Sequence, residues 1–126
     1  MPELPEVETI RKQLSDLIVG LKISDIKILH PKSFLGDKKL ALQCKVKGVR
    51  RFGKMLVIDL EGNYSLAVHL KMTGQILCQT TDNKQQITEN KYTRVILTLS
   101  NDDRIFFNDI RKFGWIRTVR NETMKQ

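Results

Sequence analysis

The chain has little of what marks several common protein classes. Only two of its 126 residues are cysteines, Cys44 and Cys78, and neither has a partner at C-x-x-C spacing. They predict neither a metal site nor a disulfide framework. No apolar run approaches the roughly 18 residues needed to span a bilayer, and the acidic start of the chain is unlike a signal peptide. We therefore expect a cytoplasmic protein without membrane attachment.

Aromatic and acidic residues are also scarce. Aromatic residues make up 6% of the chain, which argues against a platform that stacks the bases of single strands. There are 22 Lys and Arg against 14 Asp and Glu, a formal net charge of +8. The excess is regional, because residues 11–54 contain twelve basic and three acidic side chains. This region favours a polyanionic partner held through phosphate contacts. A solvated, solubilising surface is the alternative.

The length predicts one domain over residues 1–126. Apolar residues recur at helical spacing before Gly20, which predicts an amphipathic helix over residues 5–19. They are Val7, Ile10, Leu14, Leu17 and Ile18. Short segments with strand patterns follow, at residues 21–29, 44–51, 55–60, 64–70, 75–78, 92–99, 104–107 and 115–119, with a short helix near residues 38–43. The pattern predicts a mostly β fold with flanking helices, either a β-sandwich or a flattened barrel.

The first residues carry unusual chemistry. Pro2 is small enough for the initiator methionine to be removed, and its secondary α-amine would then titrate near neutrality, at roughly 7.7–8.0. Such an amine is a nucleophile without the burial that a lysine needs, and Glu3 is the nearest proton carrier. Pro5, Glu6 and Glu8 are typical of an ordinary helix start, with acids facing the positive end of the helix dipole. That interpretation leaves Pro2 and Glu3 unexplained.

Residues 2–8, Pro-Glu-Leu-Pro-Glu-Val-Glu, resemble the start of the formamidopyrimidine-DNA glycosylase family, which excises oxidised purines such as 8-oxoguanine. Leu4 favours this branch over the related endonuclease VIII branch, which usually has glycine there. The resemblance implies that Pro2 attacks C1′ of the damaged nucleoside and forms a Schiff base, with Glu3 as general acid and base. Glu6 is a candidate second acid. The resemblance also implies a two-sheet β-sandwich with flanking helices.

Lys54 follows Arg50-Arg51-Phe52-Gly53 and precedes a predicted buried strand. At that end of a sheet its ammonium group can reach a cleft. The resemblance implies that Lys54 contacts the DNA phosphate and the damaged base, whereas a solvated lysine in a basic cluster is the alternative. We expect Arg50 and Arg51 to face phosphates on the surface.

Residues 69–74, His-Leu-Lys-Met-Thr-Gly, resemble the family's His-Leu-Gly-Met-Ser/Thr-Gly segment. An extruded nucleotide leaves a hole in the duplex, and a flexible apolar side chain can fill it. Met72 is the candidate filler. Methionines are more often core residues, but the Thr-Gly turn after Met72 disfavours core packing. Lys71 departs from the family's glycine, which either alters the loop backbone or adds a phosphate contact.

Residues 108–114, Asn-Asp-Ile-Arg-Lys-Phe-Gly, resemble the family's Asp-Pro-Arg-Arg-Phe-Gly loop. The resemblance implies that Arg111 bonds the orphaned base and that Phe113 wedges into the base stack, as apolar side chains do when they kink DNA. Ile110 replaces a proline, which loosens the loop. Lys112 replaces an arginine, which keeps the charge but loses bidentate geometry.

Residues 91–95, Lys-Tyr-Thr-Arg-Val, stand where the family tends to have Lys-His-Asp-His-Val, and Arg94 is a candidate phosphate contact. Full-length family members continue through a helix-two-turn-helix segment and a zinc finger on four cysteines. We expect this chain to be the N-terminal catalytic domain without either segment. We therefore expect no cofactor, since the family's zinc lies in the second half.

Together these features predict a base-excision repair enzyme, a bifunctional DNA glycosylase and AP lyase that performs β,δ-elimination. We expect a monomer that binds damaged double-stranded DNA in the cytoplasm, at the nucleoid. The alternative is a catalytically incomplete DNA-binding domain that lacks the second half of the DNA clamp, and an intact Met1 would favour it. A small basic RNA-binding protein would explain the charge but would make the motifs coincidental.

Overall fold

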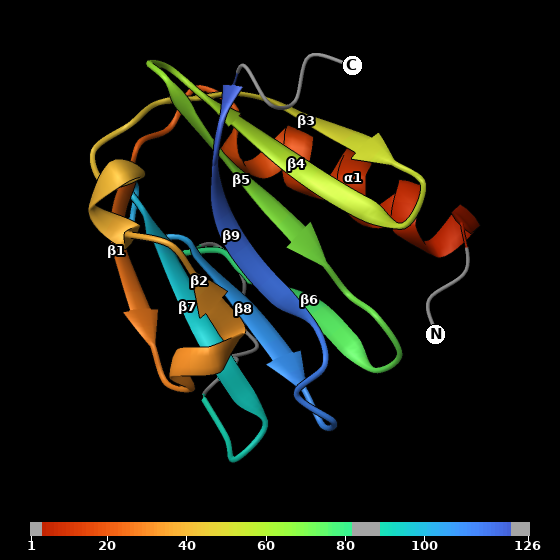
Figure 1. Ribbon diagram of the computed structural model, residues 1–126. Helices are drawn as coiled ribbons and strands as arrows, with labels where there is room; N and C mark the ends of the chain where they lie inside the picture. Colours follow the sequence, from red (N-terminus) through yellow and green to blue (C-terminus); the bar gives the residue numbers. More distant parts are fainter. Residues whose placement is uncertain (1–3, 82–88, 122–126) are drawn as a thin grey trace.

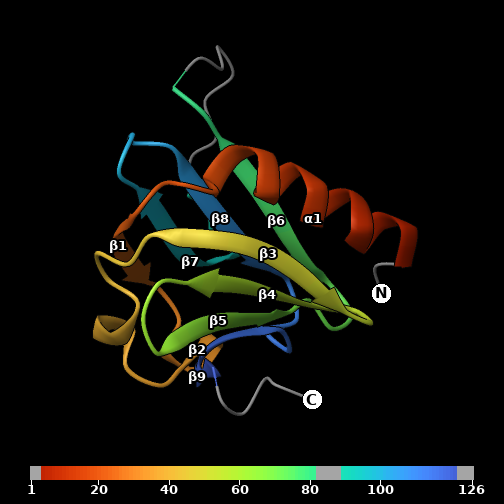
Figure 2. The same ribbon diagram turned by 90° about the horizontal axis from the view of Figure 1, so that it is seen from above.

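Two β-sheets stacked face to face form the body of the molecule, in a computed structural model that describes residues 4–81 and 89–121. The helix α1 (Leu4–Ile18) packs mainly against β3. Figures 1 and 2 show α1 along one open side of the stack, between the edge strands β3 and β6. The strands are β1 (Ile23–Ile28), β2 (Phe34–Leu35), β3 (Val46–Phe52), β4 (Met55–Leu60), β5 (Tyr64–His69), β6 (Gly74–Gln79), β7 (Thr93–Leu99), β8 (Arg104–Asp109) and β9 (Trp115–Arg120).

The sheets have four and five strands, in the orders β1-β7-β8-β6 and β2-β9-β5-β4-β3. Neighbouring strands are antiparallel except for β2 and β9. Alternate residues of the strands point between the sheets, where they meet the apolar face of α1. Val7, Leu14 and Ile18 supply that face and are at most 1% exposed. The arrangement confirms the predicted two-sheet sandwich with an N-terminal amphipathic helix.

Residues 31–37, to which the sequence pattern assigns no helix or strand, contain regular structure. They contain the 3-10 helix η1 (Pro31–Ser33) and the strand β2, and the 3-10 helix η2 (Lys38–Leu40) follows. A two-residue strand is too short to show an alternating pattern in the sequence. Gly36 follows β2 with φ +92°, and a Cβ there would lie 2.1 Å from Oγ1 of Thr118. The expected polar loop over residues 79–90 falls largely at 82–88, outside the described residues.

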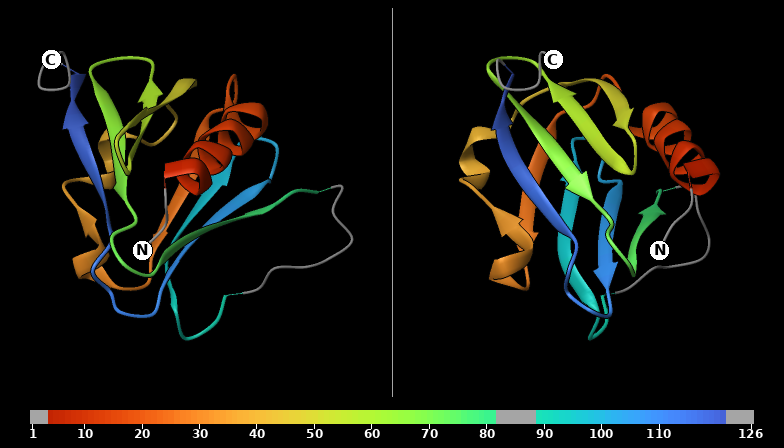
Figure 3. Two further views of the ribbon diagram at one scale, coloured as in Figure 1. Left: turned by 90° about the vertical axis from the view of Figure 1, so that its right-hand side faces the viewer. Right: turned by 45° about the vertical axis from the view of Figure 1, so that its right-hand side comes forward.

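Two crossovers between the sheets lie side by side at one end of the sandwich. The β5–β6 connection leaves the five-stranded sheet and the β8–β9 connection returns to it. Their positions are fixed by pairing, because His69 is opposite Trp115 and Gly74 is opposite Asp109. Figure 3 shows both connections at the same end of the molecule. Segments far apart in the sequence therefore form one surface.

Candidate active site and nucleic-acid interface

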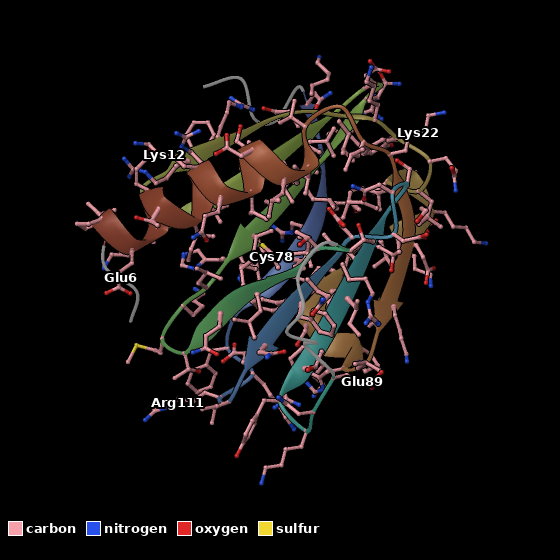
Figure 4. All side chains as sticks on the ribbon, turned by 180° about the vertical axis from the view of Figure 1, so that it is seen from behind. Glu6, Lys12, Lys22, Cys78, Glu89 and Arg111 are labelled. Atoms are coloured by element: carbon pink, nitrogen blue, oxygen red, sulfur yellow. The ribbon has the colours of Figure 1, made fainter. Side chains whose placement is uncertain are left out.

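The start of α1 lies beside the β5–β6 loop. Pro2 and Glu3 lie outside the described residues, and the helix begins at Leu4. Glu6, exposed in its first turn, and Ile10 line a surface hollow of about 410 Å³ whose other wall is residues 72–77. Figure 4 shows Glu6 at the beginning of the helix. The hollow thus brings Glu6 and Met72 together.

The helix is held in place by an ion-pair network as well as by its apolar face. Glu8 accepts from Nη2 of Arg11 at 2.8 Å and from Nε of Arg51 at 3.1 Å. These bonds, Arg11 first and then Arg51, lower the pKa of Glu8 from its ordinary 4.5 to about 2. Glu8 therefore ties α1 to the end of β3, beyond its expected service to the helix dipole.

Arg50 and Arg51, which we expect to face phosphates, are exposed, and each forms an ion pair within the chain. Arg51 pairs with Glu8, and Arg50 forms a two-bond ion pair with Asp59, with distances of 2.6 and 2.8 Å. The Arg50 guanidinium also lies 5.1 Å from the centre of the Phe52 ring. Intramolecular carboxylates already occupy these guanidinium groups, so they give the surface less free positive charge than the sequence count indicates.

Lys54 lies in the tight turn between β3 and β4. Gly53 before it has φ +58°, a left-handed value that suits glycine, and Phe52 pairs with Met55 across the turn. Met55 in turn is opposite His69 at the end of β5. The half-buried Lys54 is therefore at the same end of the sheet as the β5–β6 loop.

The β5–β6 loop keeps a glycine-like backbone despite its lysine. Lys71 has φ +52°, and its amide donates to Nδ1 of His69 at 3.1 Å. His69 is further fixed by Trp115, whose ring centre is 5.6 Å away. Met72 is 47% exposed, which agrees with a side chain that is not part of the core. Lys71 thus adds an exposed side chain without changing the left-handed backbone at that position.

The β8–β9 loop presents four exposed side chains, and two of them are large and apolar. Ile110 is 61% exposed and Phe113 is 56% exposed. Arg111 and Lys112, also exposed, lie between them, and Lys112 has φ +62°. Figure 4 shows Arg111 at the tip of this loop. We call residues 71–73 and 110–113 the two-loop tip, since the paired strand ends place these segments next to each other.

Asp109, to which the sequence reasoning gave no role, organises this tip. Its carboxylate is 1% exposed and accepts from the amides of Gly114 at 2.7 Å and Arg111 at 3.2 Å, and from the Thr73 hydroxyl. Gly114 is required at this point, because a Cβ there would lie 2.7 Å from the His69 carbonyl oxygen. An acid between a buried strand and a Gly-ended loop was a usable signal, but its partner Thr73 is 36 residues away.

Arg94 differs from its predicted role. It is 8% exposed, and its guanidinium donates to the backbone carbonyls of Asp109 at 2.9 Å and Lys91 at 3.1 Å. Asp109 is the last residue of β8, and Lys91 lies in the turn before the neighbouring strand β7. In this structure Arg94 is a positioning residue rather than a phosphate contact.

Within residues 4–81 and 89–121, no three His, Cys, Asp or Glu side chains are grouped as a metal site requires. In the same part of the chain, no helix is long and apolar enough to cross a membrane. Cys44 and Cys78 are free thiols, and burial raises the pKa of Cys78 to about 11.

Comparison with known proteins places this geometry in context. Residues 1–116 match the family model described as the formamidopyrimidine-DNA glycosylase N-terminal domain. The formamidopyrimidine-DNA glycosylase of Rickettsia massiliae is 37% identical over 130 aligned positions, which cover 100% of this chain and 45% of the relative. That of Pelotomaculum thermopropionicum is 39% identical and covers 98% and 45%. The chain therefore spans about half the length of these curated relatives.

Solved structures give the same match. The Lactococcus lactis enzyme bound noncovalently to DNA with an abasic site superposes with a TM-score of 0.84 at 30% identity, over 96% of this chain and 46% of that one. The same enzyme with DNA containing a formamidopyrimidine lesion gives 0.85 at 29% identity, over 97% and 46%.

Proposed function

Because the chain belongs to the formamidopyrimidine-DNA glycosylase family, we propose that it acts in base-excision repair and removes oxidised purines from double-stranded DNA. Its curated relatives are named for this glycosylase activity, and its solved neighbours bind DNA with an abasic site or a formamidopyrimidine lesion. The family match covers residues 1–116, which include every segment of the candidate site.

The chemistry that we propose depends on the N-terminus. Removal of Met1 exposes the secondary amine of Pro2, which attacks C1′ of the lesion nucleoside while the C1′–base bond breaks. The sugar ring then opens as the C1′–O4′ bond breaks and O4′ takes a proton, which leaves an iminium between Pro2 and C1′. The iminium acidifies the C2′ proton, and removal of that proton starts β-elimination, followed by δ-elimination. Glu3 moves the protons, and Glu6 is placed to assist from the first turn of α1. The buried face of α1 supports this proposal, since it fixes the start of the helix beside the two-loop tip.

The remaining roles follow from exposure and charge. Lys54 would bind the phosphate and the damaged base from the β3–β4 turn. Met72, Arg111 and Phe113 would fill the space left by the extruded nucleotide, with Arg111 bonding the orphaned base and Lys112 adding a phosphate contact. The single observation that carries the proposal is the exposure of Met72 and Phe113, at 47% and 56%, on adjacent loops beside the start of α1. Exposed apolar side chains among cations suit insertion into a duplex.

A second candidate function is DNA binding without turnover. In that case the two-loop tip would still enter damaged DNA, but no Schiff base would form.

Borohydride trapping separates the two functions. The processed chain is incubated with duplex DNA containing 8-oxoguanine or an abasic site and then reduced, after intact mass has shown whether Met1 is removed. The matched control variant carries a short N-terminal extension, so that the Pro2 nitrogen lies in a peptide bond and cannot act as an amine. We expect a covalent adduct with the processed chain and none with the blocked chain. Equal trapping by both would reject Pro2 as the nucleophile, and binding without any adduct would support the second function.

A further inference from the structure

The two loops of the tip share a hydrogen-bond centre around the buried Asp109. The Thr73 hydroxyl donates to Oδ1 of Asp109 and accepts from the amide of Arg111 at 3.2 Å. The same Arg111 amide lies 3.2 Å from Oδ1 of Asp109, and the Gly114 amide donates to Oδ2 at 2.7 Å. Thr73 belongs to the β5–β6 loop, whereas the other residues belong to the end of β8 and the β8–β9 loop. One carboxylate therefore bonds both loops.

The surroundings make this centre strong. Asp109 is 1% exposed and Gly114 is buried, so water competes little for their hydrogen bonds. A bond between a charged acceptor and a backbone amide is about twice as strong as a neutral one. Lys71 and Lys112 hold left-handed backbone at φ +52° and +62°, one in each loop. Non-glycine residues keep that conformation only where surrounding contacts determine it.

Each loop carries a side chain that we place in the duplex. Met72 immediately precedes Thr73. The amide of Arg111 donates hydrogen bonds to both Thr73 and Asp109. A displacement of either loop must therefore stretch bonds made by the other. The backbones of the two loops, which carry these side chains, cannot move independently without breaking the shared centre.

We propose that Thr73 and Asp109 form a lock that couples the two loops, so that Met72, Arg111 and Phe113 enter damaged DNA as one unit. The insertion part rests on the proposed function, whereas the lock itself does not. Thr73 and Asp109 are positioning residues in this account, because they act through the side chains on the loops.

The first test needs no DNA. Hydrogen exchange of individual amides is compared in the intact chain, in Thr73→Val, and in Thr73→Ser, which keeps the hydroxyl. We expect Thr73→Val to speed exchange of the Arg111 and Gly114 amides by about tenfold or more, since a bond to a charged group is lost. Thr73→Ser should restore the protection. Unchanged exchange at Arg111 in Thr73→Val would overturn the lock.

The second test measures coupling on DNA. Affinities for a duplex with a tetrahydrofuran abasic-site analogue are measured for Met72→Ala, Phe113→Ala and the double variant, with and without Thr73→Val. With the lock intact, the loss in the double variant should differ from the product of the single losses by about threefold or more. In the Thr73→Val background the losses should multiply. Multiplicative losses in both backgrounds would reject insertion as one unit.

The two tests distinguish a failure of the proposed function from a failure of the lock. No binding by the intact chain would reject the proposed function, and the exchange result would still decide the lock. Thermal unfolding of every variant serves as the folding control, and Thr73→Val keeps the size and branching of the side chain. Equal stability of Thr73→Val and Thr73→Ser with different coupling would support positioning rather than a general loss of structure.

Discussion

At the scale of single residues, the side chains around the tip and α1 are defined by the hydrogen bonds they accept. Glu8 and Asp109 each accept several hydrogen bonds. Those of Glu8 come from arginine side chains, and those of Asp109 come mainly from backbone amides. Neither role follows from residue type, since the same carboxylates on an open surface would only be solvated. Function here depends on which donors the fold brings to each group.

Glu8 predicts a specific acid sensitivity. Its pKa is lowered from 4.5 to about 2 in the folded chain, so the folded state binds fewer protons than the unfolded state. The stability from its ion pairs is therefore fully present above pH 4.5 and is lost as pH falls toward 2. The melting temperature, measured across this pH range, should fall more steeply with decreasing pH for the intact chain than for Glu8→Gln. Parallel curves would contradict the ion-pair assignment.

His69 predicts a second pH dependence, nearer neutrality. Burial, and then the Lys71 cation, lower the pKa of His69 below its ordinary 6.5. Its neutral ring accepts the Lys71 amide at Nδ1, and protonation would replace that acceptor with a donor. Stability is full above pH 6.5 and declines as pH falls toward the lowered value of the folded chain.

An NMR titration of the His69 ring checks this prediction. The ring should titrate below 6.5, and the Lys71 amide shift should follow the same curve. His69→Gln, which cannot titrate, should leave the amide shift flat over that range. A ring that titrates at or above 6.5 would show that the hydrogen bond does not hold its neutral form.

At the scale of elements, the β5–β6 loop combines a strained backbone with an added charge. Lys71→Gly should raise the free energy of unfolding, by up to about 1 kcal/mol, because glycine adopts φ +52° without steric cost. The same change removes one cation, so the slope of log affinity against log salt for duplex DNA should shrink by about 1. Lys71→Asn is the matched control, since asparagine also tolerates this backbone. An unchanged slope in both variants would exclude a phosphate contact.

Elements with a clear period were predictable from sequence, and contacts between elements were not. The helix α1 and the β4–β5 hairpin follow from apolar spacing and from a Gly-Asn turn. The strand β2 has two residues, which is too few for a pattern. These two residues form a strand because they pair with β9, and that pairing depends on the tertiary structure.

In the candidate site, too, continuous motifs could be found in the sequence, whereas contacts between distant residues could not. Lys54, Met72, Arg111 and Phe113 could be located because their motifs are continuous in the sequence. The Thr73–Asp109 bond joins residues 36 apart, so neither motif alone indicates it. Arg51 is exposed as expected, but its ion pair with Glu8, 43 residues away, could not be read from a count of charges.

At the scale of the whole molecule, three segments meet at one end of the sandwich. They are the start of α1, the β3–β4 turn and the two-loop tip, and each carries a group that we assign to catalysis or DNA contact. These segments are far apart in the sequence, and strand pairing and the buried face of α1 fix their relative positions. Such rigid placement is what a nucleophile at a chain end requires.

The most direct measurement is the position of the reduced covalent adduct on the chain. The product of borohydride trapping on abasic-site duplex DNA is digested, and the modified peptide is sequenced by mass spectrometry. The account predicts a single adduct on the Pro2 nitrogen, with Met1 absent. An adduct on Lys54 or another internal lysine, with Pro2 unmodified, would contradict it.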